Sequence, residues 1–573
     1  MSKKSGFQVV GQNNLALFTM KLHRGEGKTL IAMNWKNNKP PDDFVGFAIE
    51  YQEPGGDKFY PLKNRLRFES PKKKAGANSF STRLAPIQKF RWVHFPQNAD
   101  LPGDFIYRVT PVFMNQADEL SYGEYQEAAI VLKRETYPNQ LNVAFTRGFV
   151  SSQAFVDRYE SKGPISTLLP SGANTGLNFK PTHPETKDAL EWMGFEARME
   201  ILGLLDTAIS DPGAKVFVVA YDLNEPEIVS RLEKLKSRLR IIIDDDGPHG
   251  TQGSAENQAE VRLKKTAGAN NVKRQHMGKL QHNKTIVVDG TNLQAAICGS
   301  TNFSWRGLYV QSNNAVIVYG DSAIKPFLDA FYNYWANNSP QLFGNTNSAT
   351  INDLGLNGID AKISFSPHSA NNALLSSIAD DIEKNTTSCL LYSLAFLYQT
   401  PGSIKAAIKN VSSKNNIFSY GVSDKKVAGL DIHKPNGTIS PLYPAALSKN
   451  IPEPFKSEPT GGGGTRMHHK FIVIDFDKPT ARVYLGSYNF SGAADTSNGE
   501  NLLIIRDQKI TVSYMIDLLC LVDHYHFRVT QNETKKAKKI LVLSKPPRTP
   551  QDIFWWSEYY TDIIKIQDRI LFS

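Results

Sequence analysis

The chain has 573 residues, a length that allows three or four domains of about 150 residues each. Its 66 lysine and arginine residues outnumber its 56 aspartate and glutamate residues, and the net charge of +10 favours an anionic partner, either nucleic acid or an acidic membrane surface. No apolar run is long enough to cross a bilayer, and the N-terminus has no apolar core of a secretory signal. These features argue against a membrane-spanning protein and predict a cytoplasmic location.

The chain has three cysteines, Cys298, Cys389 and Cys520, and each lies in an apolar segment without CxxC spacing. An odd number with this spacing argues against a disulfide framework and against a zinc site, so we expect buried free thiols. No HExxH or DxDxDG sequence occurs either. The sequence therefore predicts neither a metal nor another cofactor.

Residues 1–138 contain short apolar segments such as "TLIAMNW" and "DFIYRVTPVF", separated by turn signals such as "NNKPPDD" and "PGGD". This pattern predicts a small all-β sandwich. Its strand order is similar to a fibronectin type III module, with Tyr107 as a candidate tyrosine corner. Such modules dock, space or bind partners more often than they catalyse, so we expect an accessory domain that could bind a protein partner.

From residue 139 onward, apolar strands alternate with helical patterns, which implies a βαβ architecture with a mostly parallel sheet. The order of segments then repeats. "LNVAFTRGF" from Leu141 is echoed by "AKISFSPHS" from Ala361, and "KVFVVAYD" from Lys215 is echoed by "SCLLYSLAF" from Ser388. We expect two α/β halves, residues 139–345 and residues 346–573, with the C-terminal tail in the second half.

Each half carries one copy of the same polar motif. "HNKTIVVD" from His282 and "HHKFIVID" from His468 share the frame His, any residue, Lys, four residues, Asp. A Gly-Ser pair and an asparagine follow each copy, in "GSTNFS" and "GSYNFS", and a polar residue heads another strand eleven residues after each asparagine. A fixed three-residue pattern is expected well under once in such a chain, so two matching copies argue against chance. The candidate site residues are His282, Lys284, Asp289, Ser300, Asn302 and Asn313 in the first copy, and His468, Lys470, Asp475, Ser487, Asn489 and Glu500 in the second.

The spacing of the motif fits the geometry of a strand. Residues i and i+2 of a strand point to the same side, so each histidine and its lysine present imidazole and ammonium together. The apolar runs "TIVV" and "FIVI" suit strands buried on both faces, and Asp289 and Asp475, which close them, are predicted to be structural. If the halves pack about a pseudo-twofold axis, the two histidine-lysine pairs meet in one cleft.

Both copies, including the downstream GSxN sequence, resemble the HKD motif of the phospholipase D superfamily, and the resemblance covers residues 141 to 530. It implies two pseudo-symmetric α/β halves with mixed sheets, and a metal-independent phosphodiesterase for which a monomer suffices. One histidine attacks phosphorus and forms a phosphohistidine, and the other protonates the departing oxygen. Charge on the phosphoryl oxygens would be stabilised by four donors, Lys284, Lys470, Asn302 and Asn489.

The copies differ in the polar residue that follows the asparagine, an amide in Asn313 and a carboxylate in Glu500, and this difference suggests which histidine is the nucleophile and which is the acid. We expect Glu500 to lie behind His468 and Asn313 to lie behind His282. A carboxylate favours the protonated imidazolium more than an amide does. The sequence therefore predicts His282 as the nucleophile and His468 as the general acid, which later acts as the base.

The preferred substrate is nucleic acid, because of the basic charge, the predicted cytoplasmic location and the likeness of "MHHKFIVID" to motifs of nuclease-like members. An insertion at residues 247–279 leads into the first motif and could follow a polyanion through Arg262, Lys264, Lys265, Lys273 and Arg274. DNA or RNA, and endo or exo action, stay open.

Two other classes of function are considered. A phospholipase D would use the same site to hydrolyse phospholipid headgroups to phosphatidic acid, and a secretion system that needs no cleaved signal could deliver it. Transphosphatidylation stays open. A binding module with an inactive site is disfavoured, because histidine, lysine, asparagine and aspartate are intact in both halves.

Overall fold

The computed structural model describes residues 6–69, 79–96, 98–132, 134–148, 152–170, 172–397, 400, 402–423, 432–433, 439–440, 467–536 and 541–573. The chain divides into two compact units. The first comprises Met1–Arg134, His433–Thr438 and Val512–Ser573, and the second comprises Glu135–Ile432 and Ile439–Thr511.

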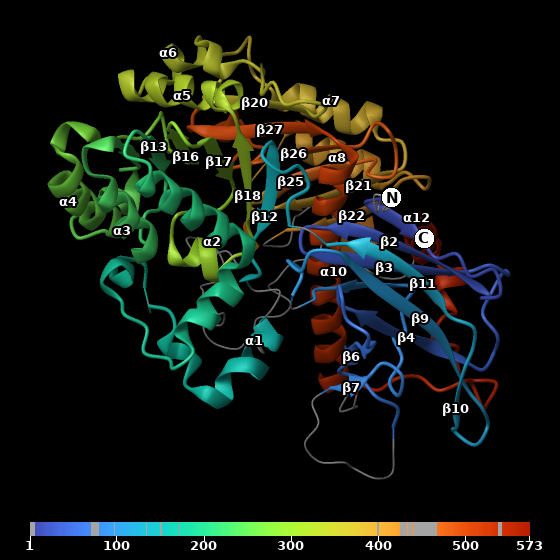
Figure 1. The fold of residues 1–573 in the computed structure, drawn as a ribbon. Coiled ribbons are helices and arrows are strands. Elements are labelled where there is room, and N and C mark those ends of the chain that lie inside the picture. The colour runs from blue at the N-terminus through green and yellow to red at the C-terminus, as the bar shows by residue number, and fades with distance from the viewer. Residues whose placement is uncertain are drawn as a thin grey trace. The chain divides into compact units, whose positions relative to one another are not determined.

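The first unit is built on two antiparallel sheets (Figure 1). One sheet has the order β1-β2-β3-β8, with β1 (Gln8–Val10), β2 (Phe18–Gly25), β3 (Lys28–Trp35) and β8 (Arg91–His94). The other has the order β10-β9-β4-β5, with β11 also on β9; its strands are β4 (Phe44–Gln52), β5 (Tyr60–Pro61), β9 (Asp104–Met114), β10 (Leu120–Tyr122) and β11 (Gln126–Val131). The short strands β6 (Lys63–Asn64) and β7 (Phe80–Ser81) pair with each other. Side chains of both sheets share one core, which makes this region a β-sandwich.

The C-terminal segment completes this sandwich. Trp556 is buried in the same core as Trp35 and Phe47. Arg91 on β8 forms two hydrogen bonds to the carboxylate of Asp568, at 2.8 and 3.1 Å. The assignment of residues 512–573 to the second half was therefore wrong, because this aromatic tail packs in the core of the first unit. Its helices are the later part of α10 (Gln508–Lys536), α11 (Glu558–Thr561) and α12 (Ile563–Phe572).

Tyr107 is fully buried in the sandwich core. Its hydroxyl lies 2.9 Å from Nδ1 of His94. A tyrosine corner bonds to backbone instead, so this contact does not support that prediction. The likeness to a fibronectin type III module stays a prediction.

The second unit contains two seven-stranded sheets with matching strand order. In the first half the order is β12-β18-β17-β16-β13-β14-β15, and in the second half it is β19-β20-β27-β26-β25-β21-β22. The first sheet consists of β12 (Leu141–Phe145), β13 (Lys215–Ala220), β14 (Leu239–Ile243), β15 (Val272–Arg274), β16 (Lys284–Asp289), β17 (Gln294–Gly299) and β18 (Asn314–Tyr319). The second consists of β19 (Asn352–Asp353), β20 (Asp360–Ser366), β21 (Cys389–Leu394), β22 (Phe418–Val422), β25 (Lys470–Ile474), β26 (Arg482–Gly486) and β27 (Glu500–Arg506). The short strands β23 (Ile432–His433) and β24 (Ile439–Ser440) pair separately.

The sheets are mixed, as the fold class predicted, but the expectation of mostly parallel strands was wrong. Parallel pairing occurs between β13 and β14, between β14 and β15, and between β21 and β22. The remaining pairs in both sheets are antiparallel, among them β16 with β17 and β25 with β26. The connection from β16 to β17 is only a short turn, and a parallel crossover needs a dozen or more residues.

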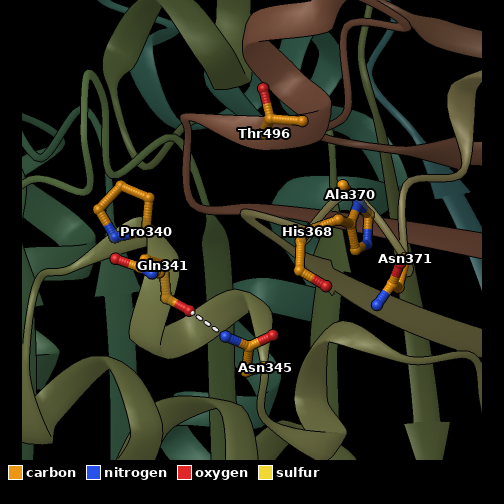
Figure 2. A pocket seen from close by; sticks show the side chains of 8 residues that line it. Pro340, Gln341, Asn345, His368, Ala370, Asn371 and Thr496 are labelled. Atoms are coloured by element: carbon orange, nitrogen blue, oxygen red, sulfur yellow. Dashed lines mark hydrogen bonds between the residues drawn. The ribbon is translucent and has the colours of Figure 1, made fainter.

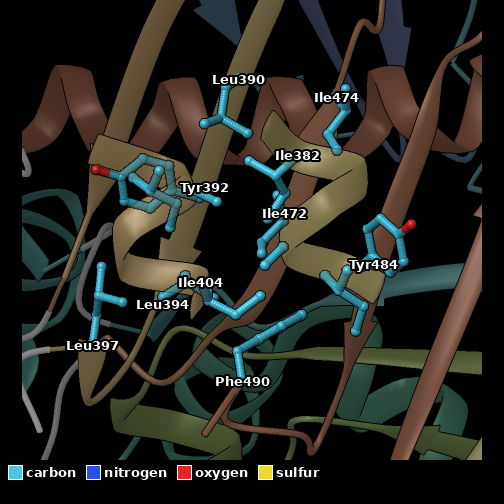
Figure 3. Packing of buried hydrophobic residues seen from close by; sticks show 14 of the residues in the cluster. Ile382, Leu390, Tyr392, Leu394, Leu397, Ile404, Ile472, Ile474, Tyr484 and Phe490 are labelled. Atoms are coloured by element: carbon cyan, nitrogen blue, oxygen red, sulfur yellow. The ribbon is translucent and has the colours of Figure 1, made fainter. Parts of the chain in front are cut away.

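Helices pack on both sheets of this unit. Ala323 and Phe327 are among the buried residues of α5, which packs on β16 and β17. In the second half, Ile382 and Ile404 on α7 and α8 meet Ile472 on β25 in one apolar cluster (Figure 3). The helices of the unit are α1 (Ser152–Tyr159), α2 (Thr186–Ser210), α3 (Pro226–Leu235), α4 (Ala255–Ala267), α5 (Asp321–Ala336), α6 (Pro340–Gly344), α7 (Leu375–Asn385), α8 (Ser403–Ser412) and α9 (Gly492–Thr496).

The sequence also predicted that the chain does not span a membrane and that its cysteines are buried free thiols. No helix among them is both long enough and apolar enough to cross a membrane. Cys298, Cys389 and Cys520 are free and buried, which confirms the prediction for the cysteines.

Candidate active site

Each motif histidine lies two residues before the start of a buried strand. β16 begins at Lys284 and β25 begins at Lys470, and both lysines are almost completely buried. The ammonium of Lys284 donates to the backbone oxygen of His282. The ammonium of Lys470 donates to the backbone oxygen of His468 at 2.9 Å and lies 3.1 Å from Nε2 of the same residue. Each imidazole thus lies beside its own lysine, at the point where the strand begins.

The polar residues behind the histidines are exchanged between the halves. Nδ1 of His282 lies 2.7 Å from Oε2 of Glu500, and Nδ1 of His468 lies 2.9 Å from Oδ1 of Asn313. The predicted pairing, with Glu500 behind His468 and Asn313 behind His282, was therefore wrong. That prediction had assumed that each histidine takes its partner from its own half.

Backbone pairing between the halves explains the exchange. Gln281, just before the first motif histidine, pairs in parallel with Gly499. Met467, just before the second, pairs in parallel with Ser312. In each pair the next residues are a histidine and its partner, so the register places the imidazole of one half against the polar side chain of the other.

The same exchange continues one residue further along both segments. Nδ2 of Asn501 donates to Oδ1 of Asn283 at 2.9 Å. Nδ2 of Asn314 lies 3.2 Å from Nδ1 of His469. The two halves are thus joined at both motifs, and the positive charges of Lys284 and Lys470 act on both motif histidines.

Burial governs the protonation of the site. It lowers the pKa of His282 and that of His468 well below the ordinary value, and the charges of the two lysines add to this effect. Burial also lowers the pKa of Lys284 to about 7. Burial raises the pKa of Glu500 to about 7, although the charge of Lys284 opposes the shift. Lowered pKa values favour the neutral form of both imidazoles, and protonation of either one requires an added negative charge, such as that of a phosphate group.

Hydrogen bonds fix the orientation of both partner residues. Asn313 donates from Nδ2 to the backbone oxygen of Gly307 at 3.0 Å, and its Oδ1 accepts from the hydroxyl of Ser300 at 2.9 Å. Because Oδ1 can only accept, Nδ1 of His468 carries the hydrogen and Nε2 remains for chemistry. In the other half, Nδ2 of Asn498 donates to Oε1 of Glu500 at 3.1 Å.

The motif serines have matching backbone roles. The hydroxyl of Ser300 accepts the backbone N–H of Asn314 at 3.1 Å. The hydroxyl of Ser487 accepts the backbone N–H of Asn501 at 2.9 Å. Each serine thus anchors the beginning of a strand at the polar partner residue of its own half, β18 in the first half and β27 in the second.

The two motif aspartates differ in their surroundings. Asp475 is buried and accepts hydrogen bonds from the backbone and hydroxyl groups of Thr387 and Ser388, and from the backbone N–H of Cys389. These contacts hold the start of β21 and agree with a structural role. Asp289 lies at the partly exposed end of β16, opposite Lys215 in the sheet register. Its structural role stays a prediction.

The two GSxN asparagines are also placed differently. Asn302 is buried, and its Nδ2 donates to Oδ2 of Asp222 at 2.8 Å. Asn489 is partly buried. The side-chain oxygen of each asparagine is buried and has no hydrogen-bond partner among the described residues.

An acidic group and a histidine beside the first motif were missed by the sequence analysis. Asp222, His249 and Glu256 bring potential ligand atoms within 4.8 Å of one another. Both ring nitrogens of His249 already lie against carboxylates, Nε2 at 2.9 Å from Asp222 and Nδ1 at 2.8 Å from Asp244. Although burial opposes a charged imidazole, these hydrogen bonds raise the pKa of His249 to about 10. We therefore describe the group as an ion-pair network, for which the short spacing of Asp244 and His249 was the available sequence signal.

The basic insertion forms part of the fold and does not present a row of unpaired cations. Most of its basic side chains contact neighbouring groups: Arg262 pairs with Glu233 at 2.7 Å, Lys264 and Arg274 pair with Glu260 at 2.6 and 3.1 Å, and Lys273 donates to the backbone oxygen of Trp335 at 2.7 Å. Lys265 is exposed. Because most of these basic side chains already contact other groups of the protein, the structure does not support the prediction that this segment follows a polyanion.

A second polar cluster borders a cavity of about 460 Å³ lined by Pro340 and His368 (Figure 2). The ring nitrogens of His368 lie 2.9 Å from the hydroxyl of Ser364 and 2.7 Å from Asp495. The order resembles a Ser-His-Asp triad, but Ser364 is only 1% exposed, and Asp495 also accepts the backbone N–H of Leu374. The cluster therefore joins β20, α7 and α9, and we assign it no reaction.

A family model described as "Cardiolipin synthase, PLD-like domain" matches residues 205–335 and 380–517, so that one matched segment spans each motif. The chain belongs to the phospholipase D superfamily. Two curated superfamily relatives, both named phospholipase D, match only a short segment. The one from Rickettsia conorii is 48% identical over 48 residues, and the one from Rickettsia felis is 46% identical over 48 residues. In each case the match covers 8% of this chain and 22% of the relative.

Solved structures give weak likenesses. Phosphatidylserine synthase of Haemophilus influenzae aligns with 66% of this chain and 91% of its own, at 14% identity and a TM-score of 0.38. Nuc of Salmonella typhimurium, a phospholipase D family member, aligns with 25% of this chain and 88% of its own, at 24% identity and a TM-score of 0.21.

Proposed function

We propose that the protein is a metal-independent phosphodiesterase that works through a phosphohistidine on His282. The observation that carries this proposal is the pair of crossed contacts, His282 with Glu500 and His468 with Asn313. They bring two imidazoles from distant parts of the chain to one site with different partners. We propose that no cofactor is needed, because a bound phosphodiester anion favours the charged forms of Lys284 and Lys470, which then supply the positive charge that a metal ion would otherwise provide.

The first step forms a covalent intermediate. Glu500 accepts the N–H at Nδ1 of His282, so the lone pair on Nε2 attacks phosphorus. The new P–N bond forms as the P–O bond to the leaving group breaks. His468, protonated once the negatively charged substrate is bound, gives its Nε2 proton to the departing oxygen. The products of this step are an alcohol and a phosphorylated His282.

The second step releases the phosphate product. His468, now neutral, takes a proton from water, and the resulting oxygen attacks phosphorus. The P–N bond breaks, and its electron pair returns to Nε2 of His282. During both steps, negative charge on the phosphoryl oxygens is stabilised by four donors, Lys284, Lys470, Asn302 and Asn489.

The role of His282 now has a different basis from the one that the sequence suggested. Attack on phosphorus leaves a positive charge on the imidazole, and a carboxylate at Nδ1 stabilises that charge in the way that the aspartate of a Ser-His-Asp triad does. Asn313 gives His468 no such charge, so His468 releases its proton more readily. We therefore keep His282 as nucleophile and His468 as acid.

Nucleic acid is the proposed substrate, supported by the net charge of +10 and by the sequence around the second motif. A phospholipid is the second candidate, favoured by the short match to the Rickettsia proteins named phospholipase D. Both motifs lie in one unit of one chain, which supports a monomer as sufficient. A protein partner for the first unit and a cytoplasmic location belong to the same proposal, and fractionation of cells tests the location.

The experiment is a cleavage assay in excess EDTA. Purified protein is incubated with labelled single-stranded DNA, duplex DNA, RNA and phosphatidylcholine or phosphatidylethanolamine vesicles, beside His282→Ala and His468→Ala. We expect nucleic-acid cleavage that survives EDTA and disappears in both variants. Release of choline or ethanolamine without nucleic-acid cleavage would replace the proposed substrate by the second candidate, and loss of all cleavage in EDTA would end metal independence.

A further inference from the structure

A chain of hydrogen bonds links Asn302 to the segment that carries the first motif. Nδ2 of Asn302 donates to one oxygen of Asp222 at 2.8 Å, and the other oxygen of Asp222 lies 2.9 Å from Nε2 of His249. Nδ1 of His249 lies 2.8 Å from Asp244, whose second oxygen accepts the backbone N–H of Gln281 at 2.6 Å. The asparagine of the GSTN sequence is thus connected to the residue just before the motif histidine.

Charge alternates along this chain, from carboxylate to imidazolium to carboxylate. Asp244 is fully buried, and the side chains of His249 and Asp222 are 13% and 24% exposed. Arg274 donates to the backbone oxygens of His249 and Asp244, at 2.7 and 3.0 Å. Because both ring nitrogens of His249 are engaged, Asp222 is held in one orientation, with one oxygen directed to Asn302.

The ring of Tyr221 connects this network to the nucleophile. Its centroid lies 4.5 Å from that of His249 and 4.6 Å from that of His282, with edge-on geometry in both cases. The ammonium of Lys284 lies 4.7 Å from the same ring. The network therefore borders the reacting groups of the first half.

The second half has a phenylalanine at the position of Asp222. Tyr221 and Ala395 occupy matching positions, since each backbone N–H donates to the residue that follows its motif histidine, at 3.1 and 2.9 Å. The next residue is Asp222 in the first half and Phe396 in the second. The ring of Phe396 packs edge-on against His468 at a centroid distance of 6.1 Å. The second half therefore has an apolar ring where the first half has the anchoring carboxylate.

We propose that Asp222 is a positioning residue that fixes the amide of Asn302, so that one N–H of Nδ2 is held by Asp222 and the other is presented to a phosphoryl oxygen. The inference rests on the proposed function. It makes the two GSxN asparagines unequal, with Asn302 as the donor arranged in advance and Asn489 as the one without this anchor.

The physical reason lies in the symmetry of a side-chain amide. An amide can turn over and present its oxygen instead of its nitrogen, and an oxygen facing a phosphoryl oxygen repels it. A carboxylate accepts only, so Asp222 allows the orientation with Nδ2 toward it and disfavours the reverse. A donor already oriented before the substrate binds stabilises the transition state without further rearrangement.

The test compares wild type with Asp222→Asn and with a matched control, Asp245→Asn. Asp245 is another carboxylate paired with a histidine, at 2.7 Å from His276, in the same acidic run as Asp244. Binding of inorganic phosphate is measured by calorimetry, and kcat and KM are measured on the cleaved substrate. We expect Asp222→Asn to bind phosphate about 10-fold more weakly and to lose kcat by about 10- to 100-fold. Asp245→Asn should change each value less than about 2-fold.

The sign of the binding change separates positioning from charge alone. Removing a carboxylate near an anion site would by Coulomb's law tighten phosphate binding. Phosphate binding as tight as in wild type, or tighter, would therefore overturn the proposal. Weaker phosphate binding in Asp222→Asn, measured at a temperature at which the variant is still folded, would support it.

The exchange variant Asp222→Asn with Asn302→Asp keeps a donor-acceptor pair between the two positions but reverses its direction. We expect thermal stability to recover toward wild type while phosphate binding and kcat stay low, because the amide no longer faces the phosphate. Recovery of binding and kcat in the exchange variant would show that the pair is merely structural. If wild type binds phosphate but cleaves no phosphodiester, the proposed function fails, and the phosphate titrations still decide the role of Asp222.

Discussion

The two halves of the catalytic unit share one backbone plan and differ in the side chains at matching positions. Strand order, motif spacing and the backbone contacts of the motif serines agree between them. The position behind the opposite histidine is an amide in the first half, Asn313, and a carboxylate in the second, Glu500. The halves also differ two residues after the strand that pairs with the motif strand. This position is Asp222 after β13 in the first half and Phe396 after β21 in the second.

The two halves share their backbone, whereas the side chains that set the chemistry of each histidine differ. A repeated backbone brings two equal histidine-lysine pairs together, but a nucleophile and an acid need different environments. The difference comes from single substitutions at matched positions, each of which changes the charge around one imidazole. The halves exchange their partners, so the carboxylate of the second half serves the histidine of the first.

The largest expected effect comes from removing the two histidines separately. His282→Ala should lose activity by about 10⁴-fold or more and form no phosphoenzyme, because no nucleophile remains. His468→Ala should lose about 10²- to 10⁴-fold on ordinary substrates, and less on a nitrophenyl phosphodiester whose leaving group needs no proton. Mass spectrometry of the quenched reaction measures the phosphoenzyme, and thermal unfolding controls for folding. A phosphate found on His468 in wild type would reverse the two roles.

Next in size is the effect of the residues behind the histidines. Glu500→Gln should lower kcat by about 10²-fold, since the charge on phosphorylated His282 is no longer stabilised. Asn313→Asp gives both halves a carboxylate behind the opposite histidine. It should raise the pKa of His468 and change kcat by less than about 10-fold. Steady-state kinetics across pH checks both. A larger loss in Asn313→Asp than in Glu500→Gln would show that the amide, and not the carboxylate, matters more for the chemistry.

A smaller effect is expected in the cores beneath the two motifs. Ile286 and Ile472 occupy the same place in the two motif strands, and both are fully buried. Ile286→Val and Ile472→Val should each lower the free energy of unfolding by about 1 kcal/mol. Chemical denaturation measures the change, with wild type as reference. A clear loss of stability from one substitution and none from the other would show that the two halves share a backbone fold but not equivalent core packing.

The last prediction concerns the pH dependence of stability and the network found in the first half alone. The pKa of His249 is raised from 6.5 to about 10, although burial opposes the shift, by hydrogen bonds to Asp222 and Asp244 and by the charge of Glu256. A raised pKa in the folded state contributes stability that is complete below pH 6.5 and is lost as pH rises through about 10. The stability difference between wild type and His249→Gln should therefore shrink over that interval.

Thermal unfolding midpoints at several pH values measure this difference. Phe396→Leu in the second half serves as the control, since it carries no titrating group. A stability difference that stays constant from pH 6.5 to 10 would contradict the assignment of His249 as an imidazolium.

The sequence by itself determined the repeat, the twelve motif residues and the placement of each histidine beside its lysine at the start of a buried strand. These features depend on local spacing, because residues two apart in a strand share a side. Local patterns also indicated the β-sandwich at the N-terminus. They did not indicate strand direction, which depends on how long the connections are and where they lead.

Only the tertiary structure decided which residues meet. His282 and Glu500 are 218 positions apart, and His468 and Asn313 are 155 positions apart. No local rule chooses between a partner in the same half and one in the other, since Asn313 and Glu500 follow the motifs of their own halves at nearly the same spacing. The register of the backbone between the halves makes that choice. The same holds for the aromatic tail, which completes the core of the distant N-terminal sandwich, and for Asp222 and His249, which form a network only after folding.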